Sequence, residues 1–138
     1  MLHSHETEIY VRFCETDAIG HVNNTSHFLY FEEARTKFFK KVYPNKPTFF
    51  AFMMANINCS YLNEAFSDQT LKVSTNIKKI GTTSFTLIQT LENVEEGTMV
   101  AEAETVIVSF DYPKKQSIKI PDVLYENLIK YMDVVDVK

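Results

Sequence analysis

Glycine, proline and cysteine are scarce in this chain, and each scarcity excludes a class of protein. Three glycines and four prolines among 138 residues are too few for a collagen-like or linker-rich chain. Two cysteines, Cys14 and Cys59, cannot build a disulfide framework. We therefore expect a cytoplasmic protein with reduced thiols.

Long apolar runs and basic blocks are also missing. The longest apolar run, Phe49–Ala55, is far too short to cross a bilayer. The first residues, MLHSHETE, show neither the basic nor the apolar region of a secretory signal. Lys and Arg number 14 against 18 Asp and Glu, which leaves a net charge of −4 and disfavours nucleic-acid binding. We expect neither a membrane nor a nucleic-acid partner.

The residues that are present are sufficient for one globular domain. Hydrophobic residues make up 45% and charged residues 23%, which is a globular composition. A chain of this length buries roughly two thirds of its unfolded surface without disulfides or metals. No repeat and no linker divides the sequence, so we expect a single domain over residues 1–138.

Apolar residues recur at helical spacing between Ser26 and Val42. Phe31, Ala34 and Phe38 share one face, and charged residues occupy most of the other. This pattern predicts an amphipathic helix with a strongly aromatic buried face. The candidates for its N-terminal cap are Asn24, Thr25 and Ser26.

Strand patterns occupy most of the remaining chain. Alternating or continuously apolar residues predict five strands, at residues 6–13, 48–62, 71–78, 83–91 and 98–111. Residues 48–62 are the most apolar, and we expect that strand to be buried. A short helix is predicted at residues 121–132, because Pro121 is allowed near a helix start. One long helix against an antiparallel sheet is an α+β design.

The loop at residues 14–25 concentrates polar side chains that could carry chemistry. It contains Asp17, His21, Asn23 and Asn24, and it ends at a helix N-terminus, which favours negative charge. A carboxylate beside free N–H groups suits acyl transfer, because the N–H groups polarise a carbonyl while the carboxylate attacks it or activates water. The same residue types also form ordinary helix caps. The pattern alone leaves both interpretations open.

This loop and the predicted helix resemble a known family. TDAIGHVNN at residues 16–24, followed by YFEEAR at residues 30–35, is similar to the hot-dog acyl-CoA thioesterases. This is the 4-hydroxybenzoyl-CoA thioesterase-like group, which also includes acyl-carrier-protein thioesterases. Arg12 and Phe13 match the start of its pattern, and segments 61–65, 80–85 and 120–122 resemble its later parts. The resemblance spans nearly the whole chain.

The resemblance implies a fold and an assembly. The fold is a five-stranded antiparallel sheet wrapped around one long central helix, with a short C-terminal helix. Subunits of the family pair so that two sheets join, and each active site lies between two subunits. We therefore expect a homodimer or a homotetramer.

The resemblance also implies an activity, the hydrolysis of an acyl-CoA, or of an acyl group on a carrier protein, to free acid and thiol. Asp17 is then the nucleophile or general base, and N–H groups at the helix start polarise the carbonyl. His21, Asn23 and Asn24 are expected to support Asp17. The expected substrate contacts are Gly20, Val22, Thr25, Lys78 and Lys79, the two lysines as point charges for coenzyme A phosphates. The activated thioester requires no cofactor and no metal.

Three positions depart from the family pattern. His27 stands where the family usually has tyrosine, and Glu64 where many members have proline. Ile19 replaces an asparagine of the plant acyl-carrier-protein thioesterases. The plant-type arrangement of Asp, Asn and His is therefore incomplete here.

Other residues offer weaker alternatives. Cys14 and His21 could form a nucleophile–base pair, but we expect Cys14 at the end of an apolar strand, where thiols are inert. The four histidines have no zinc-ligand spacing. Glu32, Glu33 and Arg35 are most simply charges on the helix surface, although one of them could line the pocket or pair across a dimer.

Two other functions are compatible with the same fold. A hot-dog hydratase or dehydratase would place its histidine five residues after the aspartate, whereas His21 follows Asp17 by four. A non-catalytic acyl-CoA or carrier-protein binding module would need no carboxylate that faces a thioester. The complete Asp17 motif therefore favours the thioesterase.

Overall fold

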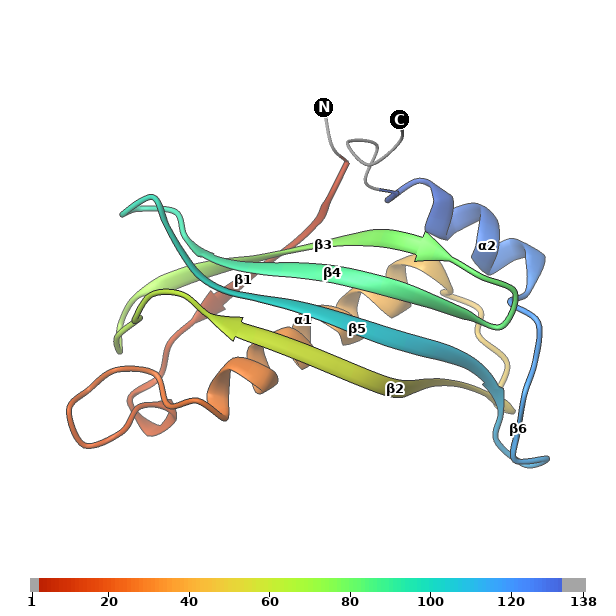
Figure 1. Cartoon of the computed structure of the whole chain (residues 1–138), viewed down its shortest axis with the longest axis horizontal. Coiled ribbons are helices and arrows are strands. Elements are labelled where there is room, and N and C mark those ends of the chain that lie inside the picture. The colour runs from red at the N-terminus through yellow and green to blue at the C-terminus, as the bar shows by residue number, and fades with distance from the viewer. Residues whose placement is uncertain (1–2, 133–138) are drawn as a thin grey trace.

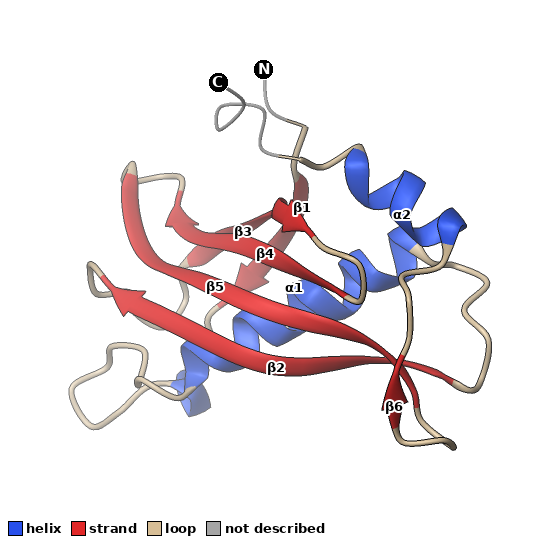
Figure 2. Ribbon diagram, turned by 45° about the vertical axis from the view of Figure 1, so that its right-hand side comes forward, coloured by secondary structure: helices blue, strands red, loops and turns tan. Residues whose placement is uncertain are grey.

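The computed structural model describes residues 3–132 and shows one antiparallel sheet with two helices (Figures 1 and 2). The elements in chain order are β1 (His5–Tyr10), a 3-10 turn η1 (Phe13–Glu15), α1 (Ser26–Val42), β2 (Phe50–Tyr61), β3 (Thr70–Ile80), β4 (Ser84–Asn93), β5 (Thr98–Asp111), β6 (Gln116–Ser117) and α2 (Asp122–Ile129). The strand order is β1-β3-β4-β5-β2, with β6 paired to the end of β5. The predicted α+β class with an antiparallel sheet is confirmed.

Helix α1 lies across one face of the sheet, and the loop before it and the helix α2 lie at opposite ends of the molecule (Figure 1). Its bounds agree with the predicted helix. Phe31, Ala34 and Phe38 are completely buried, as expected from their spacing on one helical face. The buried aromatic face therefore anchors the N-terminus of α1, and with it the polar loop, at one end of the sheet.

A polar contact crosses the core between α1 and β4. Arg35 is only 7% exposed, and its Nη1 lies 3.5 Å from Oε1 of Gln89. The amide of Gln89 in turn donates to the carbonyl of Phe31 and to Oγ1 of Thr75. The expectation of a surface charge at Arg35 is wrong, because the helix turns this side chain toward the sheet. Burial lowers the pKa of Arg35, against the opposing charge of Glu32.

The strand β2 is the main exception to the predicted burial. It forms an edge of the sheet and is largely exposed, with Met53, Met54 and Tyr61 at 39%, 51% and 45%. Among the described residues β2 pairs only with β5, so its outer edge carries unpaired backbone groups. Phe50 at the start of β2 is buried in the core, but most of the strand is an apolar edge within this chain, so the prediction of a buried strand at residues 48–62 is wrong for most of its length.

Two local features differ from the sequence prediction. The first strand ends at Tyr10 rather than at Phe13, because Glu15 accepts a hydrogen bond from the backbone of Arg12 and closes the turn η1. The five predicted strands omitted β6, a two-residue strand that returns to β5 after a turn in which Lys115 has a φ of 54°. Neither α1 nor α2 is long and apolar enough to span a membrane.

Candidate active site

Glu15 anchors the polar loop to α1. Its Oε1 accepts hydrogen bonds from the Tyr30 hydroxyl, at 2.9 Å, and from the Arg12 backbone, while the Arg12 guanidinium holds Oε2. Burial alone would raise the pKa of Glu15, but these hydrogen bonds lower it below its ordinary value. The pKa of Tyr30 is raised, by burial and by its bond to Glu15. The carboxylate therefore stays charged and holds the start of the loop in place.

Asp17 lies at the base of a tight turn within this loop. Its N–H donates to the His21 carbonyl at 3.0 Å, and its carbonyl accepts from the Gly20 N–H at 2.9 Å. Gly20 has a φ of 90°, a conformation that a side chain would strain. The Asp17 oxygen Oδ1 accepts from the Ile19 N–H at 3.2 Å, and the side chain is 42% exposed. The turn thus presents an accessible carboxylate in a defined orientation.

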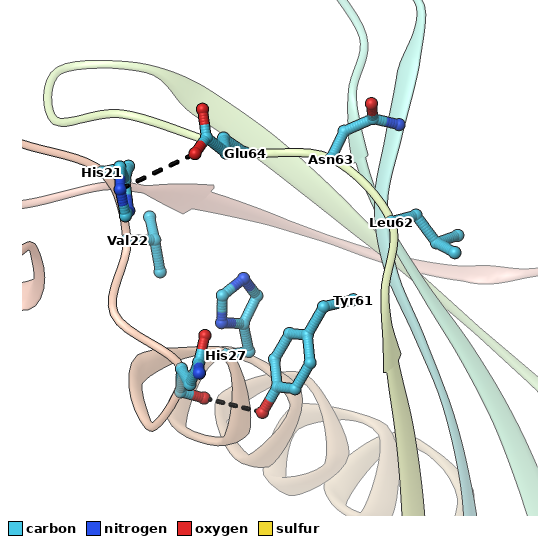
Figure 3. A pocket seen from close by; sticks show the side chains of 8 residues that line it. His21, Val22, His27, Tyr61, Leu62, Asn63 and Glu64 are labelled. Carbon is cyan, nitrogen blue, oxygen red and sulfur yellow. Dashed lines mark hydrogen bonds and ion pairs between the residues drawn. The ribbon is translucent and has the colours of Figure 1, made fainter.

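His21 lies between the carboxylates of Asp17 and Glu64, and Figure 3 shows its contact with Glu64. Its Nδ1 is 3.5 Å from Oδ2 of Asp17, and its Nε2 is 3.6 Å from Oε2 of Glu64. The histidine side chain is 22% exposed, and its ring meets the Phe66 ring edge-on. Each ring nitrogen therefore faces one acidic group.

The side chain that caps the start of α1 is that of Asn23, although the N-cap position itself belongs to Thr25, one of the three predicted candidates. Its Oδ1 accepts from the N–H groups of Thr25, at 2.9 Å, and Ser26, at 3.1 Å. Thr25 occupies the N-cap position, but its side chain makes no capping hydrogen bond. The N–H groups of Thr25 and Ser26 are thus occupied, whereas within residues 3–132 the N–H of Asn24 has no acceptor.

A cavity of about 240 Å³ opens beside His21. Figure 3 shows His27 and Tyr61 on its wall below Glu64. The Tyr61 hydroxyl donates to the Asn24 carbonyl at 2.9 Å, and Nδ1 of His27 lies 3.1 Å from the Asn23 carbonyl. Burial lowers the pKa of His27, although contacts of its ring with the backbone of Asn24 and Asn23 act in the opposite direction. The ring is therefore neutral near pH 7.

The structure brings together part of the predicted site. His21, Val22 and Asn24 line the cavity, and Asp17 contacts His21 from the same loop. His27, Glu64 and Tyr61 also line the cavity, although the sequence indicated no role in the site for them. The signals that could have identified them are the departures from the family pattern at the first two positions and the position of Tyr61 in a family-like segment.

The two predicted lysines lie elsewhere in this chain. Lys78 and Lys79 are near the end of β3 that meets α2, away from the polar loop (Figure 1). Nζ of Lys78 is 2.8 Å from Oε2 of Glu104. Their contact with substrate stays a prediction.

The alternative sites are also placed by the structure. Cys14 was expected at the end of an apolar strand, but it is exposed on η1, because the chain turns away from the sheet after Tyr10. No group of three His, Cys, Asp or Glu residues in the described part of the chain is arranged to hold a metal ion.

A family model of the thioesterase-like superfamily matches residues 11–128. This chain belongs to the thioesterase-like superfamily. It is 28% identical over 130 residues to the long-chain acyl-CoA thioesterase FadM of Escherichia coli, a match that covers 89% of this chain and 96% of FadM. An uncharacterised protein of Bacillus subtilis, YsmA, is 37% identical over 91 residues, or 64% of this chain and 60% of YsmA.

Solved structures share the fold of this thioesterase-like chain. A predicted thioesterase from Bacillus stearothermophilus superposes with a TM-score of 0.83 at 28% identity, over 94% of this chain and 97% of that one. This likeness covers 94% of the chain, and the family model includes the polar loop, so the loop and the cavity lie in a hot-dog framework.

Proposed function

We propose that this protein hydrolyses acyl-CoA thioesters, with Asp17 as the essential carboxylate. The observation that carries the proposal is the placement of an exposed Asp17 against His21, beside a cavity at the N-terminus of α1. Membership of the thioesterase-like superfamily and the likeness to FadM support it. Acyl groups on a carrier protein present the same thioester and are the second substrate class.

Asp17 can act by either of two routes. As a general base, it takes a proton from water while the water oxygen bonds to the carbonyl carbon; the C–S bond then breaks and the proton passes to the thiolate. As a nucleophile, its own oxygen bonds to the carbonyl carbon and the thiolate leaves, after which water hydrolyses the resulting anhydride. Both routes give one acid and one thiol.

The carbonyl oxygen needs a hydrogen-bond donor as it gains charge. Asn23 occupies the N–H groups of Thr25 and Ser26, so these two donors are engaged by the protein itself. The N–H of Asn24 stands at the same helix start, where the helix dipole favours negative charge, and Asn24 lines the cavity. We assign the polarisation of the thioester carbonyl to this group.

A second copy of the chain would complete the site. The exposed edge of β2 carries unpaired backbone groups and apolar side chains, among them Met53 and Met54. Antiparallel pairing of two β2 strands about a two-fold axis would set the Phe50 end of one strand beside the Tyr61 end of the other. The cavity next to Tyr61 would then lie between two subunits, in a homodimer or in a homotetramer built from two such pairs. We place the enzyme in the cytoplasm, because Cys14 and Cys59 are both free thiols.

Thiol release from a panel of acyl-CoAs and an acyl-carrier protein tests this proposal. We expect Asp17→Asn to reduce kcat by about 10²–10⁴-fold, because the catalytic carboxylate becomes a neutral amide. The matched control is Asp68→Asn, an exposed aspartate outside the cavity, whose φ of 70° asparagine also tolerates. Full activity of a folded Asp17→Asn protein would disprove the assignment.

Two further experiments distinguish the catalytic routes and test the alternative function. A single turnover in ¹⁸O-labelled water identifies the nucleophile route when water attacks the Asp17 carbon of the anhydride, because the product acid then carries an unlabelled Asp17 oxygen and the label enters Asp17. Tight acyl-CoA binding without turnover of any thioester would instead indicate a binding module.

A further inference from the structure

Glu64 approaches His21 from a different part of the chain. It follows β2 in the segment 62–65, which is tied to β5 by hydrogen bonds from the Leu62 and Asn63 N–H groups to the Val100 carbonyl. The next residue, Ala65, is buried, and its carbonyl accepts from the Val22 N–H at 2.7 Å. Backbone contacts on both sides therefore fix the separation between this segment and the loop that carries His21.

The two ring nitrogens of His21 face different carboxylates, Nδ1 that of Asp17 and Nε2 that of Glu64. Asp17 and Glu64 are the charged groups in contact with the ring, and Phe66 is its aromatic neighbour. A neutral imidazole carries one N–H and can satisfy only one of the two carboxylates, whereas an imidazolium donates at both nitrogens.

We propose that Glu64 is a positioning residue of the active site, which holds Nε2 of the His21 ring so that Nδ1 stays directed at Asp17. The inference rests on the proposed function, since its effect on catalysis passes through Asp17. A His21 ring held in this orientation keeps its contact with Oδ2 of Asp17, the carboxylate that attacks a carbonyl or accepts a proton from water.

A purely structural role for Glu64 is a poor explanation of this contact. The Glu64 side chain is 67% exposed, and exposed ion pairs contribute little to folding stability. Its carboxylate is aimed at the one histidine that contacts Asp17, as Figure 3 shows for the pair. Removal of its charge should therefore alter the titration of His21 and leave the fold intact.

The first test does not require activity. The His21 ring signals are followed by NMR from pH 4 to 9 in the wild type and in Glu64→Gln, and are assigned with His21→Gln. We expect the titration midpoint of His21 to move to lower pH by about 0.5–1 unit in Glu64→Gln and to return part of the way in Glu64→Asp. The matched control, Glu126→Gln on α2, should leave it in place. An unmoved midpoint in Glu64→Gln would overturn the inference.

The second test measures the pH dependence of kcat and KM for thioester hydrolysis. We expect the limb of the kcat profile that reports His21 to move to lower pH in Glu64→Gln, with KM nearly unchanged and with no further effect of Glu64→Gln in a His21→Gln background. An NMR shift without a kcat shift would contradict the catalytic role of Glu64. If the wild type hydrolyses no thioester, the proposed function fails, while the NMR result still decides whether Glu64 acts on the His21 ring.

Discussion

The hydroxyl of Tyr30 donates a 2.9 Å hydrogen bond to Oε1 of Glu15, which joins helix α1 to the loop that carries Asp17. Tyr30 is 2% exposed, so this bond is shielded from water. Ser26 adds a second link, because its Oγ donates to the Glu15 carbonyl at 2.9 Å. The orientation of the candidate catalytic carboxylate therefore depends on a contact with the buried face of the helix.

The first prediction concerns this bond. We expect Tyr30→Phe to lower the free energy of unfolding by about 1 kcal/mol, because one buried hydrogen bond is lost while the ring still packs. Thioester turnover should fall as well, since the loop loses an anchor. Urea denaturation and thiol release measure the two effects. Tyr125→Phe, at an exposed tyrosine of α2, is the control, and equal behaviour of the two variants would contradict the prediction.

The second prediction concerns His5 and pH. Burial lowers the pKa of His5 from 6.5, and the charges of Lys41 and Lys37 lower it further. Because the unfolded chain then binds more protons, stability is fully present above about pH 6.5 and decreases as the pH falls through that value toward the folded pKa. His5→Phe keeps the packing against Phe38 and removes the buried, unpartnered Nδ1.

We therefore expect the stability difference between pH 8 and pH 5.5 to be smaller in His5→Phe than in the wild type. It should not vanish, because the pKa of His27 is also lowered by burial. Denaturant melts at the two pH values measure the difference. Identical differences in both proteins would show that His5 does not contribute.

The third prediction concerns the polar contact between Arg35 and Gln89. Gln89→Leu leaves the buried guanidinium without its acceptor, and we expect a loss of about 1–3 kcal/mol of stability. The double variant Gln89→Leu with Arg35→Met should recover part of this loss, because the unpartnered buried charge is gone. Urea denaturation measures the free energy of unfolding of the single and the double variant. A double variant that is no more stable than Gln89→Leu would contradict the prediction that the unpartnered Arg35 charge causes the loss.

The fourth prediction concerns the edge strand β2. We expect Met54→Lys to shift the protein from a dimer toward a monomer, since a charge would be buried where two β2 strands meet. Light scattering after gel filtration measures the mass. Val94→Lys makes the same change at a similarly exposed apolar residue between β4 and β5, and it should leave the assembly unchanged. A Met54→Lys protein with unaltered mass would exclude this edge as the interface.

Periodicity was a reliable guide wherever one face of an element is buried within this chain. The spacing of Phe31, Ala34 and Phe38 places α1, because these positions share the face that meets the sheet. Composition was a poorer guide at β2, where a long apolar segment suggested a core position but most of the strand is exposed in this chain. Apolar residues are needed at a surface covered by another chain as well as in a core, so composition does not distinguish the two.

The sequence by itself determined the fold class, the long helix and the loop that carries Asp17, because these depend on local spacing and on a contiguous motif. Only the tertiary structure decided which side chains meet. Glu64 reaches His21, and Gln89 reaches Arg35, across long sequence separations set by strand pairing and helix packing. The capping side chain is that of Asn23, because its Oδ1 faces the N–H groups of Thr25 and Ser26. Neighbouring polar residues differ in the direction of their side chains, and that direction is set by the folded backbone.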